Sequence, residues 1–283
     1  MKVQESVFIE RLGREMKLRN YSLRTIKSYS INLSKVEDFY HLPIDKITIP
    51  QLKDFLYHRL TKDNISVSLV NQTISAYKII QEDVLGKEWE PIRIKRPRME
   101  KKLPTVLNVD EIEKLLYVTS NIKHKSLIAL AYSSGLRREE VRLLKPSDID
   151  SQSMRVRVNS GKGKKDRYTI LSLKALELLR IYYQLQRPEN YLFEASGKKG
   201  KCLAGSTLNA IVKQAATKAA INKNISFHTL RHCFATHLLE KGTNLRLIQQ
   251  FMGHSSLKTT SIYLHVADIN PRAVISPLDN MEV

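Results

Sequence analysis

Apolar side chains recur every three or four residues through the first third of the chain, which is the period of an amphipathic helix. A first helix is predicted over about residues 3–19, and Ser22 is the expected N-cap of a second. Thr48 opens a third helix, and either Ser66 or Ser68 opens a fourth. No strand pattern interrupts these helices, so this part of the sequence predicts a helical unit.

The rest of the chain mixes helical and strand periods. Alternating apolar and polar residues predict strands over 154–158 and 167–171, and the segment "SGKGKKD" between them predicts a hairpin turn. Helices are predicted over about residues 109–118, 122–134, 138–145, 173–186, 206–221, 228–241, 245–251 and 258–266. The expected fold class is therefore mainly α with a small antiparallel sheet (α+β).

A proline-rich basic segment separates the two patterns. The stretch "PIRIKRPRMEKKLP" (91–104) has three prolines and six lysines or arginines, which is typical of a solvated linker. We therefore expect a first domain over 1–92, a basic linker over 93–104 and a second domain over 105–283. Such a linker is also suited to lie along a phosphate backbone.

The net charge of the chain indicates which class of molecule it binds. The chain has 47 Lys and Arg against 28 Asp and Glu, a net charge of +19, which favours a polyanion and nucleic acid first. Its longest apolar runs are far short of the ~20 residues that span a bilayer, and its N-terminus is too charged for a secretory signal. The two cysteines have no metal or disulfide spacing. These features predict a cytoplasmic protein that faces nucleic acid, without a membrane partner.

The stretch "ISFHTLRHCFATHLL" (225–239) is open to a metal or a phosphate interpretation. His228 and His232 are four apart on one predicted helical face, but no glutamate lies between them as in zinc hydrolases. Arg231 on the same face would repel a cation, so we expect no metal here. His237, with Phe234 one turn back, is more typical of a core histidine whose partners are satisfied.

A second arginine motif strengthens the phosphate interpretation. In "SSGLRREEVRLL" (133–144), Arg137 begins a predicted helix, and Glu140 three residues later is placed to brace it. Arginine forks match phosphate oxygens and remain charged at any working pH. Taken alone, this segment is equally compatible with a solvated charged helix face. The lysines of "SGKGKKDR" (160–167), taken alone, are more typical of a solubilising turn.

Taken together, these segments resemble one family, the tyrosine recombinases, over nearly the whole chain. The resemblance is carried by "GLRREEV", "GKGKKDR", "HTLRH" with "FATHLL", and "GHSSLKTTSIYLH", and the first half resembles the family's helical (SAM-like) core-binding domain, including "YSLRTIKSY" (21–29). The resemblance implies a two-domain clamp around duplex DNA and is strongest to the Xer type, including its archaeal single-protein form. The usual leucine before Gly-His is replaced by Met252, a volume-conserving change that we expect to be tolerated.

The resemblance also implies roles for residues at matching positions. The implied catalytic residues are Arg137, Lys162, His228, Arg231, His254 and Tyr263. In this assignment Tyr263 attacks the DNA and forms an O-(3′-phospho-DNA)-tyrosine, the arginines and His254 hold the phosphate, His228 acts as base and Lys162 protonates the leaving oxygen. Glu140, His232 and His265 are expected to support these groups. No cofactor is expected, because the covalent link conserves the energy of the broken bond. No metal is expected, because the sequence shows no evident cluster of carboxylates to hold one.

Contacts with DNA and with other subunits are also expected. The candidate DNA contacts are Arg24, Lys27, Asn71, Lys78, Lys95, Arg96 and Lys164. The resemblance implies a homotetramer that joins two recombination sites, each with two half-sites, in some cases with a paralogous recombinase. It further implies a Holliday junction intermediate and chromosome dimer resolution, with the tail beyond Pro271 contacting a neighbouring protomer or folding back in cis.

Three alternatives remain open from the sequence. An integrase or transposase of a mobile element would use the same chemistry, and a type IB topoisomerase would share it but relax DNA without site preference. A non-catalytic DNA-binding protein that keeps the fold would have no use for Tyr263.

Overall fold

The computed structural model describes residues 6–88, 103–159 and 166–268, and it divides into two compact units, Met1–Lys101 and Lys102–Val283. Among the described residues, helices dominate and the strands are short and antiparallel, so the predicted fold class is confirmed. No described helix combines the length and the apolar character that crossing a bilayer requires. The predicted contacts Lys95 and Arg96, the hairpin residues Lys162 and Lys164, and the tail beyond Pro271 lie outside the described residues.

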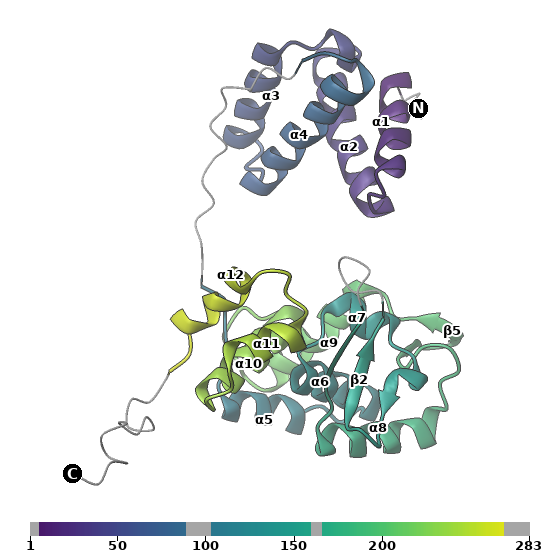
Figure 1. Cartoon of the computed structure of the whole chain (residues 1–283), viewed down its shortest axis with the longest axis vertical. Helices are drawn as coiled ribbons and strands as arrows, with labels where there is room; N and C mark the ends of the chain where they lie inside the picture. The colour runs from purple at the N-terminus through teal and green to yellow at the C-terminus, as the bar shows by residue number, and fades with distance from the viewer. Residues whose placement is uncertain (1–5, 89–102, 160–165, 269–283) are drawn as a thin grey trace, which may run out of the picture. The chain divides into compact units, whose positions relative to one another are not determined.

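The first unit is helical throughout its described part (Figure 1). Its elements are α1 (Val7–Leu18), α2 (Leu23–Tyr40), the short 3-10 helix η1 (Ile44–Lys46), α3 (Ile49–Thr61), α4 (Val67–Ile79) and the π-helical turn η2 (Ile80–Val84). The predicted N-caps are confirmed, because Ser22, Thr48 and Ser66 each accept a hydrogen bond from the backbone three residues on. Thr48 also forms a capping box with Gln51.

The core of this unit is formed by one apolar stripe from each helix. Leu12 and Met16 of α1, Leu33 of α2 and Leu52 of α3 are fully buried. Tyr77 of α4 is buried with them, and its hydroxyl donates to the backbone oxygen of Ile47. The polar partner of the tyrosine is thus supplied by the loop before α3.

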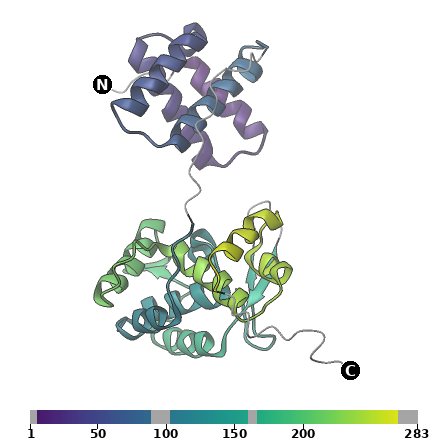
Figure 2. The same ribbon diagram turned by 90° about the vertical axis from the view of Figure 1, so that its left-hand side faces the viewer.

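The second unit contains more elements and two small sheets (Figures 1 and 2). Its helices are α5 (Val109–Tyr117), α6 (Ile122–Ser134), α7 (Arg138–Leu143), α8 (Leu173–Gln186), α9 (Gly205–Lys218), α10 (Phe227–Glu240), α11 (Leu245–Met252) and α12 (Leu257–Thr260), with 3-10 turns η3 (Pro146–Asp148) and η4 (Ser261–His265). Strands β1 (Ile149–Asp150), β2 (Arg155–Val158) and β3 (Arg167–Ile170) form one antiparallel sheet in that order, and β4 (Glu194–Ala195) pairs with β5 (Lys198–Cys202). β3 lies at the edge of its sheet, beside α11.

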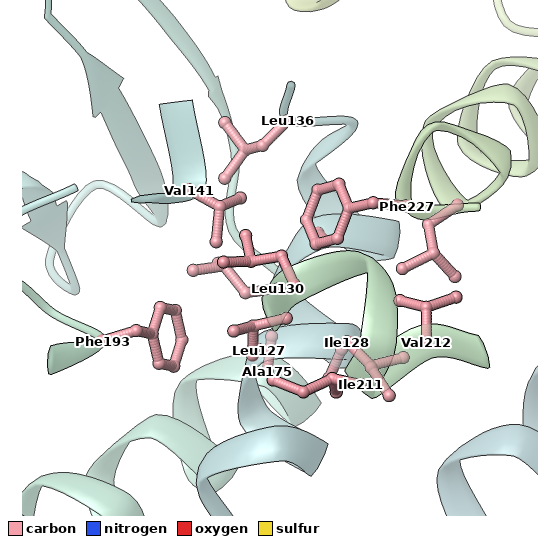
Figure 3. Close-up of a cluster of buried hydrophobic side chains, with 14 of the residues drawn as sticks. Leu127, Ile128, Leu130, Leu136, Val141, Ala175, Phe193, Ile211, Val212 and Phe227 are labelled. Atoms are coloured by element: carbon pink, nitrogen blue, oxygen red, sulfur yellow. The ribbon is translucent and has the colours of Figure 1, made fainter. Parts of the chain in front are cut away.

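Helix α6 lies at the centre of this unit's core (Figure 3). Leu127 and Leu130 of α6 are fully buried and face Phe227 of α10 and Phe193, which precedes β4. Because α6 carries buried residues on all sides, its apolar pattern is that of a central helix rather than a surface helix. The ends of α6 and α10 are therefore held firmly, and both helices contribute to the site described below.

The last predicted helix is partly wrong. The sequence predicted one helix over about 258–266, whereas α12 ends at Thr260 and the chain continues as the 3-10 turn η4. The run Thr259, Thr260, Ser261 and Ile262 has low helix propensity, and the Ser261 hydroxyl bonds back to the Lys258 carbonyl. Strands β1, β4 and β5 were not predicted, because segments this short leave little periodicity to detect.

Candidate active site

Two arginines from different elements are brought together in the second unit. Arg137 is the N-cap of α7, and Arg231 lies in the first half of α10 with a side chain only 4% exposed. The Nη1 of Arg231 donates to the carbonyl oxygen of Gly135 at 2.6 Å, and its Nη2 donates to that of Met252. The Nη2 of Arg137 donates to the carbonyl oxygen of Gly253 at 2.8 Å. Both guanidiniums are thus fixed by the turns at the ends of α6 and α11.

Gly135 is required at the first of these turns for two reasons. Its φ of +60° lies in the left-handed region, and it ends α6 in that conformation. A Cβ at this position would lie 2.3 Å from Cδ1 of Phe234, on the helix that carries Arg231. The close approach of α6 and α10 that places the Gly135 carbonyl on Arg231 therefore depends on glycine.

Glu140 lies between the arginines, and its side chain is 7% exposed. Its Oε2 accepts from the backbone nitrogen of Arg137 at 2.7 Å, and its Oε1 accepts from Nη1 of Arg137 at 2.8 Å. Arg167, the first residue of β3, donates to both carboxylate oxygens at 2.7 and 2.8 Å. Burial raises the pKa of Glu140, but hydrogen bonds and charge from Arg167 and Arg137 outweigh burial and hold it at about 2.

The cluster therefore carries an excess of positive charge. Three guanidiniums, from Arg137, Arg167 and Arg231, surround one carboxylate, Glu140. Burial and the like charge of Arg137 lower the pKa of Arg231 to about 9, which still leaves it protonated at neutral pH. A partly buried site with this balance is suited to an anion with two or more oxygens, such as a phosphodiester.

Two histidines border the cluster in their neutral form. Burial, followed by the charges of Arg231 and Arg137, lowers the pKa of His254 to about 3, and its Nδ1 lies 2.9 Å from the hydroxyl of Thr260. Burial, with the nearby His228 and Arg231, lowers the pKa of His232 to about 4. Both rings are therefore available as neutral hydrogen-bonding groups at pH 7.

Tyr263 lies in η4 and is 2% exposed, packed in an apolar cluster with Phe234 and Met252. Its hydroxyl is 2.9 Å from Nδ1 of His232. Burial raises the pKa of Tyr263 to about 12, although the charges of Arg231 and Arg137 act in the opposite direction. The phenol therefore keeps its proton at neutral pH, and its hydroxyl is hydrogen-bonded to the neutral ring of His232.

Other residues singled out from the sequence lie outside this hydrogen-bonded cluster. His228 is exposed on the first turn of α10, and burial and then the charge of Arg231 lower its pKa. His265 is exposed and makes no hydrogen bond or ion pair within the described residues. His237 is buried, with its ring nitrogens 2.9 Å from the hydroxyl of Tyr132 and from the carbonyl oxygen of Leu107, so its interpretation as a core histidine is confirmed.

In the first unit, the candidate DNA contacts lie on α2 and α4. Arg24 and Lys27 are exposed on α2. Asn71 is partly buried on α4, and Lys78 on the same helix lies 3.5 Å from Glu82. The two helices are joined by a hydrogen bond of 3.0 Å from Ser28 to Gln72. The four candidates thus occupy neighbouring helices.

Two side-chain contacts of this site, Arg167 with Glu140 and His232 with Tyr263, were not predicted from the sequence. Arg167 was read only as part of a basic hairpin, although it stands opposite the buried Val158 in the strand register, which marks an inward position. His232 was expected to be supporting, but no periodicity could pair it with Tyr263, 31 residues later. The described residues contain no group of three or more His, Cys, Asp or Glu arranged to hold a metal ion.

Comparisons with known proteins identify the family of the chain. Residues 8–91 match the phage integrase N-terminal SAM-like domain, and residues 105–269 match the phage integrase family. A tyrosine recombinase of Thermosipho africanus is 34% identical over 262 residues, which cover 89% of this chain and 92% of that protein. The tyrosine recombinase XerA of Pyrococcus horikoshii is 32% identical over 276 residues, covering 96% and 94%.

Among solved structures, the XerH site-specific recombinase bound to its palindromic difH substrate, in a post-cleavage complex, superimposes with a TM-score of 0.71. The two chains are 25% identical, and the match covers 92% of this chain and 81% of that chain. The chain therefore belongs to the phage integrase family of tyrosine recombinases and is of the Xer type.

Proposed function

We propose that this recombinase cuts and rejoins DNA at specific sites through a covalent link between Tyr263 and a 3′ phosphate. The observation that carries the proposal is the arginine cluster, in which three guanidiniums share one carboxylate beside a buried tyrosine hydroxyl. Most nucleases neutralise the developing charge on phosphorus with metal ions. Here, fixed guanidiniums are suited to that task.

Arg137 and Arg231 hold the two non-bridging oxygens of the scissile phosphate. Both side chains are fixed by backbone carbonyls, which leaves them oriented before DNA arrives. Preorganised donors of this kind need no rearrangement as charge develops, so they stabilise the transition state more than mobile side chains do.

His254 adds a further hydrogen bond to the phosphate. Nδ1 of His254 lies 2.9 Å from the Thr260 hydroxyl. In the tautomer that serves this role, the hydroxyl donates to Nδ1 and the neutral ring carries its proton on Nε2. Nε2 has no partner among the described residues, so its N–H is available to a phosphate oxygen.

Tyr263 is the nucleophile, and its side chain is withdrawn from solvent. Its side chain is buried and its hydroxyl is bonded to His232, so η4 must shift for the oxygen to reach the phosphate. His228, which is exposed and whose pKa is lowered, takes the phenolic proton. The tyrosine oxygen then bonds to phosphorus, and the bond from phosphorus to the 5′ oxygen breaks.

Lys162 protonates the departing 5′ oxygen, by family resemblance. Rejoining is the reverse step, in which a 5′ hydroxyl attacks the phosphotyrosine and releases Tyr263. Glu140 does not react, because its pKa of about 2 keeps it ionised and its oxygens are occupied by arginines. No metal ion or nucleotide cofactor takes part in this scheme.

We also propose that the chain acts in the cytoplasm as a homotetramer that pairs two recombination sites, alone or with a paralogous recombinase. The recombination reaction passes through a Holliday junction. The chain's duplex DNA partner is supported by the XerH structure, which holds the difH substrate. Resolution of chromosome dimers is the role that best fits an Xer-type chain.

A covalent-trapping assay tests the proposal. Purified protein is mixed, in the presence of EDTA, with labelled duplexes that are nicked near candidate sites, and the products are separated on a denaturing gel. A slow band that disappears in Tyr263→Phe is expected, because phenylalanine keeps the buried ring and removes only the nucleophilic oxygen. A band that persists in Tyr263→Phe, or cleavage that requires a divalent metal, would contradict the proposal.

A further inference from the structure

Arg167 is the arginine of the cluster whose two Nη atoms form a bidentate contact with the carboxylate of Glu140. Its side chain is 11% exposed, and its two Nη atoms donate to the two oxygens of Glu140. Its Nε donates to the carbonyl oxygen of Phe251 at 2.9 Å. All three nitrogens of the Arg167 guanidinium are thus engaged within the protein.

The hydrogen bonds from Arg167 complete the set that Glu140 can accept. Each oxygen of Glu140 receives two donors, one from Arg137 and one from Arg167. A carboxylate has about four lone-pair directions, so these four bonds saturate it. Arg231, whose Nη1 is 3.9 Å from Oε2 of Glu140, instead directs its donors to the Gly135 and Met252 carbonyls.

Loss of Arg167 would change this balance. Two acceptor positions of a buried carboxylate would open within 4 Å of Arg231, and an unsatisfied buried charge is costly. Arg231 and Arg137 would move toward Glu140, and the cluster would fall from three positive charges against one negative to two against one. Both changes weaken a phosphate clamp.

Arg167 also sets the position of the turn that leads to His254. An added Cβ at Gly253 would lie 2.7 Å from Cδ of Arg167, so the arginine stem fills the space that any larger residue would need. The carbonyl of the same glycine accepts from Nη2 of Arg137. One side chain therefore contacts the carboxylate, the Gly253 turn and the end of α11.

We propose that Arg167 is a positioning residue for phosphodiester cleavage, which saturates Glu140 so that this carboxylate does not draw Arg137 and Arg231 away from the scissile phosphate. The proposal rests on the function proposed above. It assigns to β3 a part in assembling the site that is separate from the hairpin lysine before it.

The test compares the rate of covalent-complex formation on nicked duplexes for the wild-type chain and for Arg167→Met and Arg167→Lys. We expect Arg167→Met to lower the rate by about 100-fold, and Arg167→Lys to recover only part of it because lysine cannot bond both carboxylate oxygens at once. Binding of a single half-site should change by less than about threefold, because it depends on many phosphate contacts.

Two further measurements separate positioning from a loss of folding. In Arg167→Met with Glu140→Gln, the carboxylate that would capture Arg231 is also gone, so the double variant should cleave faster than Arg167→Met alone. The pKa of His254, followed by NMR, should rise in Arg167→Met, because a nearby positive charge has been removed. Arg157→Met is the matched control, because Arg157 lies on the adjacent strand β2 and its guanidinium is paired with the buried Asp148.

The outcomes distinguish the two proposals. If wild-type protein forms no Tyr263-dependent band, the proposed function fails. If wild-type protein forms the band and Arg167→Met forms it at a similar rate, the positioning role is wrong. The role is also wrong if Arg167→Met loses no more activity than Arg157→Met, or if the losses in the double variant simply multiply.

Discussion

Arg24 and Lys27 lie exposed on α2 of the first unit, whereas Arg137, Arg167 and Arg231 of the second unit surround a buried carboxylate. The exposed charges are solvated and mobile, and their attraction to DNA is screened beyond about 8–10 Å at ordinary salt. The clustered charges are fixed by carbonyls and by Glu140, and they act where water is largely excluded. In the proposed scheme, the same residue types thus serve affinity in one unit and chemistry in the other.

This difference follows from what each unit can hold in place. A surface lysine on a helix has mostly water around it, and neighbouring carboxylates form weak pairs such as Lys78 with Glu82 at 3.5 Å. In the second unit, the ends of α6 and α11 present carbonyls to Arg231 and Arg137. In the second unit, the orientation of these side chains therefore comes from the backbone at helix ends.

The largest effect is expected for Arg231→Met. Removing a fixed donor to the phosphate should lower the rate of covalent-complex formation by about 10³-fold. The Gly135 and Met252 carbonyls would also lose their donor, so the free energy of unfolding should fall by about 1–3 kcal/mol. Single-turnover cleavage and urea denaturation measure the two effects. Arg24→Met is the matched change in the first unit, and equal losses of cleavage in both variants would contradict the contrast between the units.

An intermediate effect is expected when pH is lowered. The folded state keeps His232 and His254 neutral, with pKa values of about 4 and about 3, while the unfolded chain takes up protons below about pH 6.5. The unfolded state therefore binds more protons, and stability falls by about 1–2 kcal/mol per histidine between pH 6.5 and pH 5. Urea denaturation at pH 7 and pH 5 measures this loss. His254→Gln should reduce this loss, and equal pH dependence in the wild-type chain and in His254→Gln would contradict the prediction.

The smallest effect is expected in the first unit. Arg24→Gln with Lys27→Gln should weaken half-site binding by a few-fold, and the slope of log K against log salt should become shallower by about one unit for each phosphate that is no longer neutralised. Cleavage on saturating DNA and the free energy of unfolding should change little, because both side chains are exposed. Fluorescence binding measured across salt concentrations is the test. Arg11→Gln with Arg14→Gln on α1 is the charge-matched control, and an identical change in slope would place the contacts elsewhere.

Elements with strong local signals were predicted well from the sequence. Thr48 and Gln51 form a capping box at the start of α3, and α6 has the predicted bounds, Ile122–Ser134. These features depend on neighbours within four residues, which a sequence pattern contains. The last helix was predicted less well, because burial of Tyr263 against α10 and α11 holds η4 in a tighter turn that local propensity does not specify.

The sequence by itself determined the helical class, the basic character and the residue types that match the family's motifs, because each depends on composition, period or local spacing. Only the tertiary structure decided which of these residues meet. Arg167 saturates Glu140 from a strand 27 positions away, and His232 holds the hydroxyl of Tyr263 across 31 positions. Such partners are set by the packing of β3 against α6 and α11 and of η4 against α10. Packing between elements distant in the chain leaves no period in the sequence.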